Sequence, residues 1–162
     1  MTDTFISKET LGLAAEFAVA SELCRRGIYA QLTLGNRKST DLLVDAEDGQ
    51  MLRIQVKAKQ KRQWPGLKGV SGPAMVLVLV DYEKKQLHER PDFFILVPAD
   101  WKEFVRKSLI KTGKVDSGVV TLNKQFVPTW RDNYVGMGVK ADEVAKYKER
   151  WETIRELLGL IP

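Results

Sequence analysis

The sequence predicts an α/β protein in which a mixed central β-sheet is flanked by helices, and two kinds of strand segment lead to this fold class. Residues 40–44 and 52–59 alternate apolar and polar side chains, as half-buried strands do. Residues 74–80 and 92–97 are near-continuous apolar runs, which are typical of strands covered on both faces. A sheet that contains such strands needs helices packed on its faces.

Helices are predicted on both sides of these strands in the chain. Residues 7–26 begin with a serine that can cap the first turn and end before Gly27. The stripe of this helix that we expect to be buried consists of Leu13, Phe17, Ala20 and Cys24. Asp100 is expected to cap a short helix that runs to about Ser108. Residues 141–158 form a helix whose apolar stripe packs either on the sheet or on a second subunit.

Two further segments complete the predicted sheet and its connections. Residues 28–34 are expected to form the strand that follows the first helix. Residues 64–73 contain prolines and glycines and are predicted to form a loop. Trp64 in this loop either stacks on a base or fills the edge of the core, and we favour the core.

The composition sets limits on the architecture and on the chemistry. The 162 residues are expected to form a single domain over residues 1–162, with its core at about residues 7–108. A hydrophobic content of 44% and a charged content of 29% are ordinary for a soluble globular protein. The sequence shows no membrane-spanning run and no signal peptide, so we expect a cytoplasmic protein with no membrane partner. One cysteine and one histidine exclude an internal disulfide, a cysteine-based zinc cluster and a histidine-rich metal site.

The loop between the two alternating strands decides which of their side chains meet. A two-residue turn would place Asp41 opposite Val56, on the apolar face. A three-residue loop pairs Asp41 with Gln55 and places Gly49 where a left-handed residue is needed. We favour this register because a one-residue slip would turn the polar side chains into the core. It brings Asp41, Gln55 and Lys57 together in a patch that suits a hard cation and a phosphate, although a solvated hairpin face would look similar.

Two other features bear on this patch. Glu16 lies among small apolar residues of the first predicted helix, and a buried carboxylate there would need a metal ion or Lys57 as its partner. A half-exposed glutamate is the alternative. The net charge is +5, and basic residues but no acidic ones occur between Asp48 and Asp81. A basic stripe beside the patch favours phosphate binding over simple solubilisation.

The order of these residues resembles the PD-(D/E)xK nuclease superfamily, also called restriction-endonuclease-like. Glu16 in the first helix is followed by Asp41 at the start of a strand, and by residues 55–57 after a hairpin. The pattern is most similar to the Holliday-junction-resolvase-like and uncharacterised bacterial branches of the superfamily. The resemblance covers about residues 7–81 and implies an αβββαβ core.

The resemblance implies a role for each residue of the pattern. Asp41 is similar to the central metal ligand, and Glu16 to the helix glutamate that touches the metal shell. Lys57 is similar to the lysine that orients or helps to deprotonate the attacking water. Gln55 stands where the superfamily usually has an acidic residue. Its amide oxygen and the Val56 carbonyl would complete the protein ligands of a Mg²⁺ or Mn²⁺ ion.

Contacts to nucleic acid are predicted in the basic segments on either side of the patch. One segment is the polar loop that leads into Asp41, and the other continues from the strand that carries Lys57. The expected phosphate-binding residues are Arg37, Lys38, Ser39, Lys59, Lys61 and Arg62.

The predicted function is a metal-dependent endonuclease that hydrolyses phosphodiester bonds, and the resemblance favours DNA over RNA. Because one domain holds one site, cutting both strands of a duplex would need a homodimer, for which the stripe through Trp151 offers an interface. The alternative is a catalytically weak or inactive nuclease-like module that binds nucleic acid, since Gln55 removes one negative charge. No GxGxxG, P-loop or GxSxG motif is present to support an enzyme acting on small molecules.

Overall fold

The structure is a computed structural model that describes residues 5–33 and 40–160 of the chain. Its central sheet has five strands in the order β1-β2-β3-β5-β6. These strands are β1 (Ala30–Leu32), β2 (Leu42–Asp45), β3 (Met51–Lys59), β5 (Met75–Asp81) and β6 (Asp92–Leu96). β3 and β5 are parallel, and the other neighbouring strands are antiparallel. The predicted fold class, a mixed sheet flanked by helices, is confirmed.

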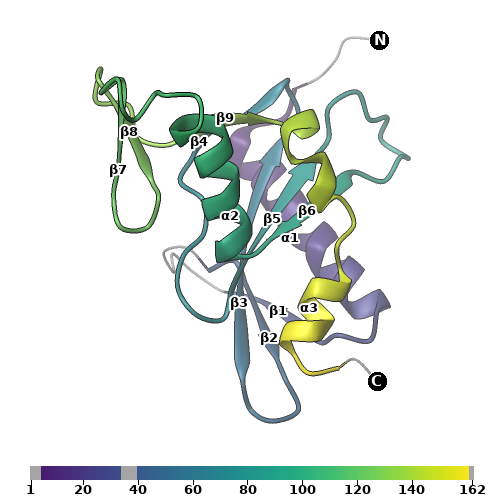
Figure 1. The fold of residues 1–162 in the computed structure, drawn as a ribbon. Coiled ribbons are helices and arrows are strands. Elements are labelled where there is room, and N and C mark those ends of the chain that lie inside the picture. The colour runs from purple at the N-terminus through teal and green to yellow at the C-terminus, as the bar shows by residue number, and fades with distance from the viewer. Residues whose placement is uncertain (1–4, 34–39, 161–162) are drawn as a thin grey trace.

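Helices cover both faces of this sheet (Figure 1). They are α1 (Lys8–Arg25) and α3 (Glu152–Leu157) on one face and α2 (Pro98–Val105) on the other. Along β5, Val76 and Val78 pack with α1, whereas Leu77 and Leu79 pack with α2. Both faces of β5 are buried, which is why its sequence is apolar throughout. In the described part of the chain, no helix has the length and apolar character needed to cross a membrane.

Smaller elements surround α2. Two-stranded sheets are formed by β4 (Gln63–Leu67) with β9 (Met137–Lys140) and by β7 (Val120–Leu122) with β8 (Pro128–Trp130). A π-helical segment, η1 (Arg106–Ile110), extends α2, and a 3₁₀ helix, η2 (Ala141–Tyr147), follows β9. In Figure 1 the β7–β8 hairpin projects away from the central sheet.

The β2–β3 hairpin has the predicted register. Val44 faces Leu52 across the two strands, and the same register places Asp41 opposite Gln55. Gly49 in the connecting loop has a φ of +81°. This left-handed backbone is the reason for a glycine at the last position of a three-residue hairpin loop.

The crossover from β3 to the parallel strand β5 runs through β4, where the αβββαβ pattern has a helix. Pro65 and Gly66 lie inside β4, and Gly66 has a φ of +58°, so this segment cannot continue as a helix. The predicted loop over residues 64–73 therefore begins with a strand. Trp64 is buried and its indole N–H donates to the Val80 carbonyl at 3.2 Å, so it belongs to the core as expected.

The helix α1 begins as predicted but buries a different face. The backbone N–H of Thr10 donates to the hydroxyl of the capping residue Ser7. The buried row contains Leu11, Ala15, Val19 and Leu23. In the predicted stripe, Leu13 is 51% exposed and Phe17 is 56% exposed, so that expectation is wrong. Apolar side chains occur on more than one side of α1, and periodicity alone could not select the row that packs on the sheet.

The predicted helix over residues 141–158 is interrupted. Lys148 is extended and forms a β-bridge with Phe94 of the edge strand β6, which separates η2 from α3. The apolar stripe is divided between the faces of the sheet, with Val144 and Tyr147 on the α2 side and Trp151, Ile154 and Leu158 on the α1 side. The stripe is therefore buried within one chain, and the proposal that it forms a dimer interface is wrong.

The start of α2 also differs from the prediction. The helix begins at Pro98, with Val97 as its N-cap. Asp100 lies one turn further on, where its carboxylate accepts a hydrogen bond from the Val97 N–H at 2.9 Å. Proline suits the first helical position because its missing N–H would have no partner there.

Candidate metal and phosphate site

The candidate site lies where β2 separates from β3. β2 begins at Leu42, but β3 continues beyond the residue opposite it, so the next part of β3 has no partner strand on that side. Asp41 fills this gap. Its N–H donates to the Ile54 carbonyl at 2.9 Å, and its Oδ2 accepts a hydrogen bond from the Val56 N–H at 2.7 Å. The carboxylate thus satisfies a backbone donor that would otherwise have lost its partner.

The Val56 carbonyl is directed toward the same gap. The N–H and C=O of one strand residue project to the same side, and the N–H of Val56 contacts Asp41. Within the described residues, the second carboxylate oxygen of Asp41, Oδ1, receives no hydrogen bond. Among the described residues, the Val56 carbonyl and this carboxylate oxygen are therefore candidate ligands for a cation.

Gln55 and Lys57 project from the face of β3 that is turned away from α1. Gln55 lies beside Leu77 and Lys57 beside Leu79 in the parallel pairing with β5, and both leucines belong to the core under α2. Gln55 is half-buried and Lys57 is exposed. Among the described residues, neither side chain has a hydrogen-bond or ion-pair partner. Both remain free to bind a ligand.

Glu16 joins this neighbourhood from α1. Burial of the half-buried side chain raises the pKa of Glu16, the negative charge of Asp41 raises it further, and the positive charge of Lys57 opposes the shift. These charge effects require proximity, so the helix, the residue before β2 and the middle of β3 contribute to one electrostatic site. A cation among these groups would relieve the repulsion between Glu16 and Asp41.

The donor set fits a hard divalent cation. It consists of the carboxylates of Asp41 and Glu16, the amide oxygen of Gln55 and the carbonyl of Val56, and oxygen ligands suit Mg²⁺ or Mn²⁺. The protein charge is low: across residues 5–33 and 40–160, no three acidic, cysteine or histidine side chains come together as a metal-binding group. Water and phosphate oxygens would therefore complete the shell, as is usual for Mg²⁺.

The prediction that Lys59 binds phosphate is wrong. Its side chain is 1% exposed, and its Nζ lies 2.7 Å from Asp81 and 2.8 Å from Glu83. The ammonium also lies over the ring of Trp64. Lys59 does share the polar face of β3 with Lys57, but β4 and the end of β5 cover that part of the face. The charge of Lys59 is therefore neutralised by carboxylates within the protein and is not available to a phosphate.

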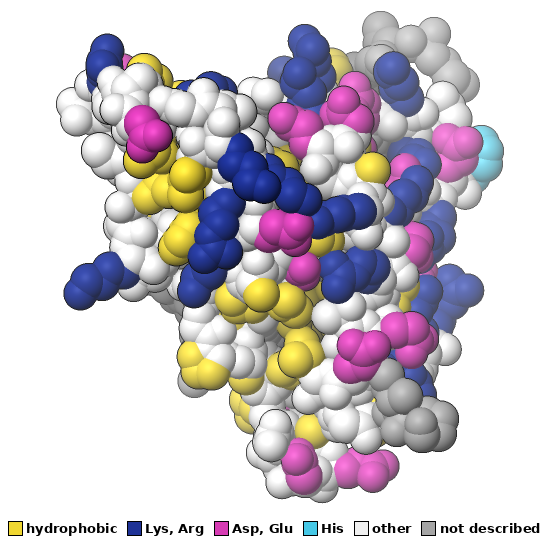
Figure 2. Space-filling view, in the orientation of Figure 1, with side chains coloured by type: hydrophobic (Ala, Val, Ile, Leu, Met, Phe, Trp, Pro, Cys, Tyr) yellow, Lys and Arg dark blue, Asp and Glu magenta, His cyan; other side chains and the backbone are white. Residues whose placement is uncertain are grey.

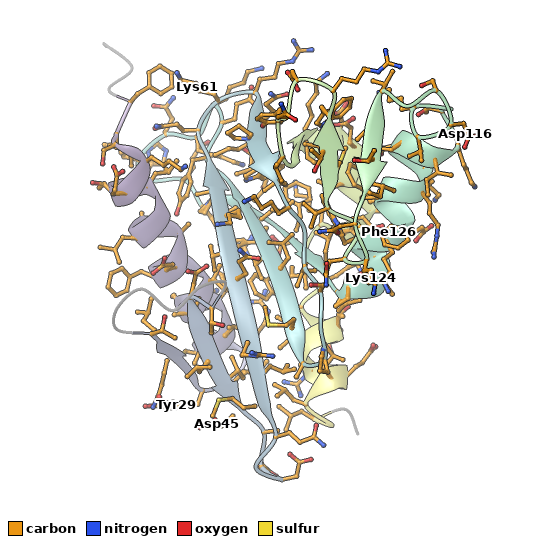
Figure 3. All side chains as sticks on the ribbon, turned by 90° about the vertical axis from the view of Figure 1, so that its left-hand side faces the viewer. Tyr29, Asp45, Lys61, Asp116, Lys124 and Phe126 are labelled. Carbon is orange, nitrogen blue, oxygen red and sulfur yellow. The ribbon has the colours of Figure 1, made fainter. Side chains whose placement is uncertain are left out.

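The other predicted phosphate-binding residues have different outcomes. Lys61 and Arg62 are exposed just beyond the end of β3, and Lys61 is labelled there in Figure 3. In the same view β2 and β3 lie in front, with α1 on one side and α2 on the other. The contacts of Lys61 and Arg62 with nucleic acid remain predictions. Arg37, Lys38 and Ser39 lie outside the described residues.

The face shown in Figure 2 carries charges of both signs. Lysine and arginine side chains gather over α2, with acidic side chains among them. Glu103 of α2 lies 2.8 Å from Lys107 and 3.0 Å from Lys146. Much of the positive charge on this face is thus neutralised by ion pairs, in contrast to Lys57. We therefore expect nucleic acid at the β2–β3 side of the molecule.

The structure adds one residue that the sequence did not place at the site. Lys68 lies in the connection from β4 to β5 and lines a cavity of about 330 Å³ together with Gln55 and Lys57. In the sequence Lys68 is one of the basic residues between Asp48 and Asp81. Its position between Gly66 and Gly69 was the only local feature that could have indicated a role at the site. Its approach to β3 depends on how β4 is held by β9.

Fold and site together define an α/β protein in which a lysine and a set of oxygen ligands meet where two strands separate. Among solved structures, that of a bacterial homing endonuclease, I-Ssp6803I, is similar, with a TM-score of 0.49 and 18% sequence identity over 93% of this chain and 93% of that chain. No family model and no curated protein matches this sequence. The function proposed below therefore depends on the residues of this chain.

Proposed function

We propose that the protein is a metal-dependent endonuclease that hydrolyses phosphodiester bonds in DNA. The observation that carries this proposal is the convergence of Asp41, the Val56 carbonyl and Lys57 where β2 separates from β3. A Mg²⁺ or Mn²⁺ ion bound there would neutralise phosphate charge and make the attacking water more acidic. The resemblance in the sequence supports DNA over RNA as the substrate.

Each side chain of the site has a role in this proposal. Asp41 and the Val56 carbonyl would hold the cation from the gap beside β2, and the amide oxygen of Gln55 would hold it from β3. Lys57 is free to donate to a phosphate oxygen or to the attacking water, where it would stabilise the charge that develops in the transition state. Glu16 would hold Lys57 in place or reach the cation through a water molecule.

The decisive experiment is a cleavage assay of the wild type and Lys57→Ala on supercoiled, linear, single-stranded and branched DNA and on RNA. Each reaction is run with Mg²⁺, with Mn²⁺ and with a chelator. We expect cleavage that needs the metal and that falls by about 10²-fold or more in Lys57→Ala, since a preorganised donor at the reacting phosphate is lost. The preferred substrate would narrow the biological role.

The control for this assay is Lys84→Ala, which removes an exposed lysine from the connection between β5 and β6. It should cleave at the wild-type rate. Metal-dependent cleavage that is equally fast in Lys57→Ala would show that the activity comes from another site or from a contaminant. Cleavage of RNA but not of DNA would show that DNA is not the substrate, and it would leave the proposed catalytic site unchanged.

A second function is a nuclease-like module that binds nucleic acid without cutting it. The observation that favours it is the neutral side chain of Gln55 next to Asp41, where a second carboxylate would hold the cation more firmly. Such a module would bind with a salt-dependent affinity and without a metal requirement. Retained binding with no cleavage on any substrate would therefore favour this function.

The charge of residue 55 gives a separate prediction. Gln55→Glu should tighten Mg²⁺ binding by about tenfold, because an anionic ligand replaces a neutral one. Mg²⁺ titration by calorimetry, with the cleavage rate measured over the same range, checks this. Gln50→Glu adds the same charge at the exposed end of the hairpin and should leave the affinity unchanged. Equal affinities of the wild type and Gln55→Glu would remove residue 55 from the ligand set.

A further inference from the structure

A cavity of about 330 Å³ opens beside the candidate site, on the face of β3 that is turned away from α1. Its floor is formed by Gln55 and Lys57 of β3 and by Leu77 of β5. Its wall consists of the end of β4 and the start of the connection to β5, residues 66–69, which brings Lys68 to the cavity. Figure 1 shows this connection on the opposite side of the sheet from α1. The cavity is therefore continuous with the metal and phosphate site through two shared residues.

The wall of the cavity is held in a defined conformation by close backbone packing. Gly69 has a φ of +73°, and a Cβ atom there would lie 2.0 Å from the ring of Trp101. A Cβ atom on Gly136 of the neighbouring segment would lie 2.6 Å from the carbonyl oxygen of Gly66. Trp101 is itself fully buried. Lys68 is thus carried by a backbone that is packed on both sides, and the cavity is formed before a ligand arrives.

The residues that line the cavity are suited to binding an anion. Lys57, Lys68 and Gln55 are the polar side chains that line the space, and among the described residues no acidic one lines it. Among the described residues neither lysine is in an ion pair, whereas Lys59 on the same strand face has two carboxylate partners. Two like charges in one cavity repel each other until an anion joins them.

We propose that this cavity is a second phosphate subsite, which binds the nucleotide unit next to the scissile phosphate and holds its phosphate through Lys68. The inference rests on the proposed function, because it uses Lys57 as the lysine of the scissile phosphate. Lys68 is a positioning residue for the strand. Its loss should raise the KM for a nucleic-acid substrate and leave kcat nearly unchanged, whereas the loss of Lys57 should lower kcat.

The test uses short ligands with one or two adjacent phosphates, in the presence of a chelator. The dinucleotide d(TpT) and its 5′- and 3′-phosphorylated forms are titrated into wild type, Lys68→Ala and Lys111→Ala, and the backbone amide signals of residues 66–69 are followed by NMR. We expect one phosphorylated form to bind the wild type about tenfold more tightly than d(TpT), which is the size expected for a charge-assisted contact. This gain should disappear in Lys68→Ala and persist in Lys111→Ala, which removes an exposed lysine outside the cavity.

The outcomes separate this inference from the proposed function. For each ligand, the affinity for Lys68→Ala is compared with the affinity for the wild type. If the two phosphorylated ligands lose no more affinity than d(TpT), Lys68 does not bind the additional phosphate and the subsite is overturned. This holds even if cleavage still depends on Lys57. If the additional phosphate is bound through Lys68 but no substrate is cut, the subsite holds and the nuclease function fails. Lys68→Arg keeps the charge and should restore most of the affinity, which a merely structural role of Lys68 would not predict.

Discussion

Asp41→Asn is expected to lower metal-dependent cleavage by at least about 10³-fold, the largest loss of activity for any single substitution at the site. The Oδ2 of Asp41 lies 2.7 Å from the Val56 nitrogen, so its charge would anchor the proposed cation beside Val56. Asparagine has the same shape and can still accept the hydrogen bond from the Val56 N–H through its amide oxygen. The substitution therefore removes the charge and keeps the local backbone. Single-turnover cleavage rates over a Mg²⁺ titration measure the effect.

Two companion variants make this result specific. Asp41→Ala also removes the acceptor of the Val56 N–H and should lower the free energy of unfolding by about 1–2 kcal/mol more than Asp41→Asn. Asp45→Asn makes the same change of charge at the exposed far end of β2 and should keep wild-type cleavage. Wild-type cleavage by Asp41→Asn would show that the cation is not bound where β2 separates from β3.

The largest effect on stability is expected at Glu22. Glu22→Gln should lower the free energy of unfolding by about 2–4 kcal/mol near neutral pH, because a buried carboxylate with several partners is lost. The side chain is 7% exposed and lies between 2.6 and 3.1 Å from guanidinium nitrogens of Arg25, Arg26 and Arg90. Arg90 also pairs with Glu149 at 2.6 Å. The network ties α1 to the segments that precede β6 and α3.

The contribution of Glu22 should depend on pH in one direction. The hydrogen bond from Arg90 is the largest cause that lowers the pKa of Glu22 from 4.5 to about 2, with burial opposing it and Arg26 adding to it. A carboxylate whose pKa is lowered by folding stabilises the protein above its unfolded pKa. This stabilisation is lost as the pH falls from about 4.5 to about 2. The difference between wild type and Glu22→Gln should therefore be complete near neutral pH and disappear near pH 2.

Urea unfolding at neutral pH and at several acidic pH values measures this difference. Glu156→Gln serves as the control, since Glu156 is exposed in α3 and its loss should change the free energy of unfolding by less than about 0.5 kcal/mol. A difference between wild type and Glu22→Gln that stays constant over the acidic range would show that the network stabilises by packing and not by charge.

The core of the candidate site was predictable because its residues are neighbours along a hairpin. The alternation of apolar and polar residues defines which side chains share a face, and Gly49 defines the loop length. These two local signals were enough to place Asp41 opposite Gln55 and near Lys57. Glu16 comes from a distant helix; its apolar neighbours in the sequence indicate a metal ion or Lys57 as its partner, and the family resemblance adds a place at the metal shell.

The parts that could not be predicted depend on contacts between distant segments. Lys59 lies on the same face of its strand as Lys57, but it forms ion pairs with Asp81 and Glu83 at and just beyond the end of β5. Glu22 has Arg25 and Arg26 as neighbours three and four residues along α1, but it becomes buried because Arg90 reaches it from a distant segment. Nothing within three or four residues of either side chain indicates these partners.

Local periodicity and turn chemistry were therefore sufficient for the strands of the central sheet and for the register of β2 on β3. They work because a backbone hydrogen bond or a glycine conformation is decided by a few neighbouring residues. The buried face of α1, the division of the C-terminal stripe and the cavity at Lys68 were decided by the tertiary structure. Each of these depends on which apolar surfaces are removed from water when all segments pack together. The free energy of this burial is a sum over contacts between distant segments, so no short stretch of sequence determines it.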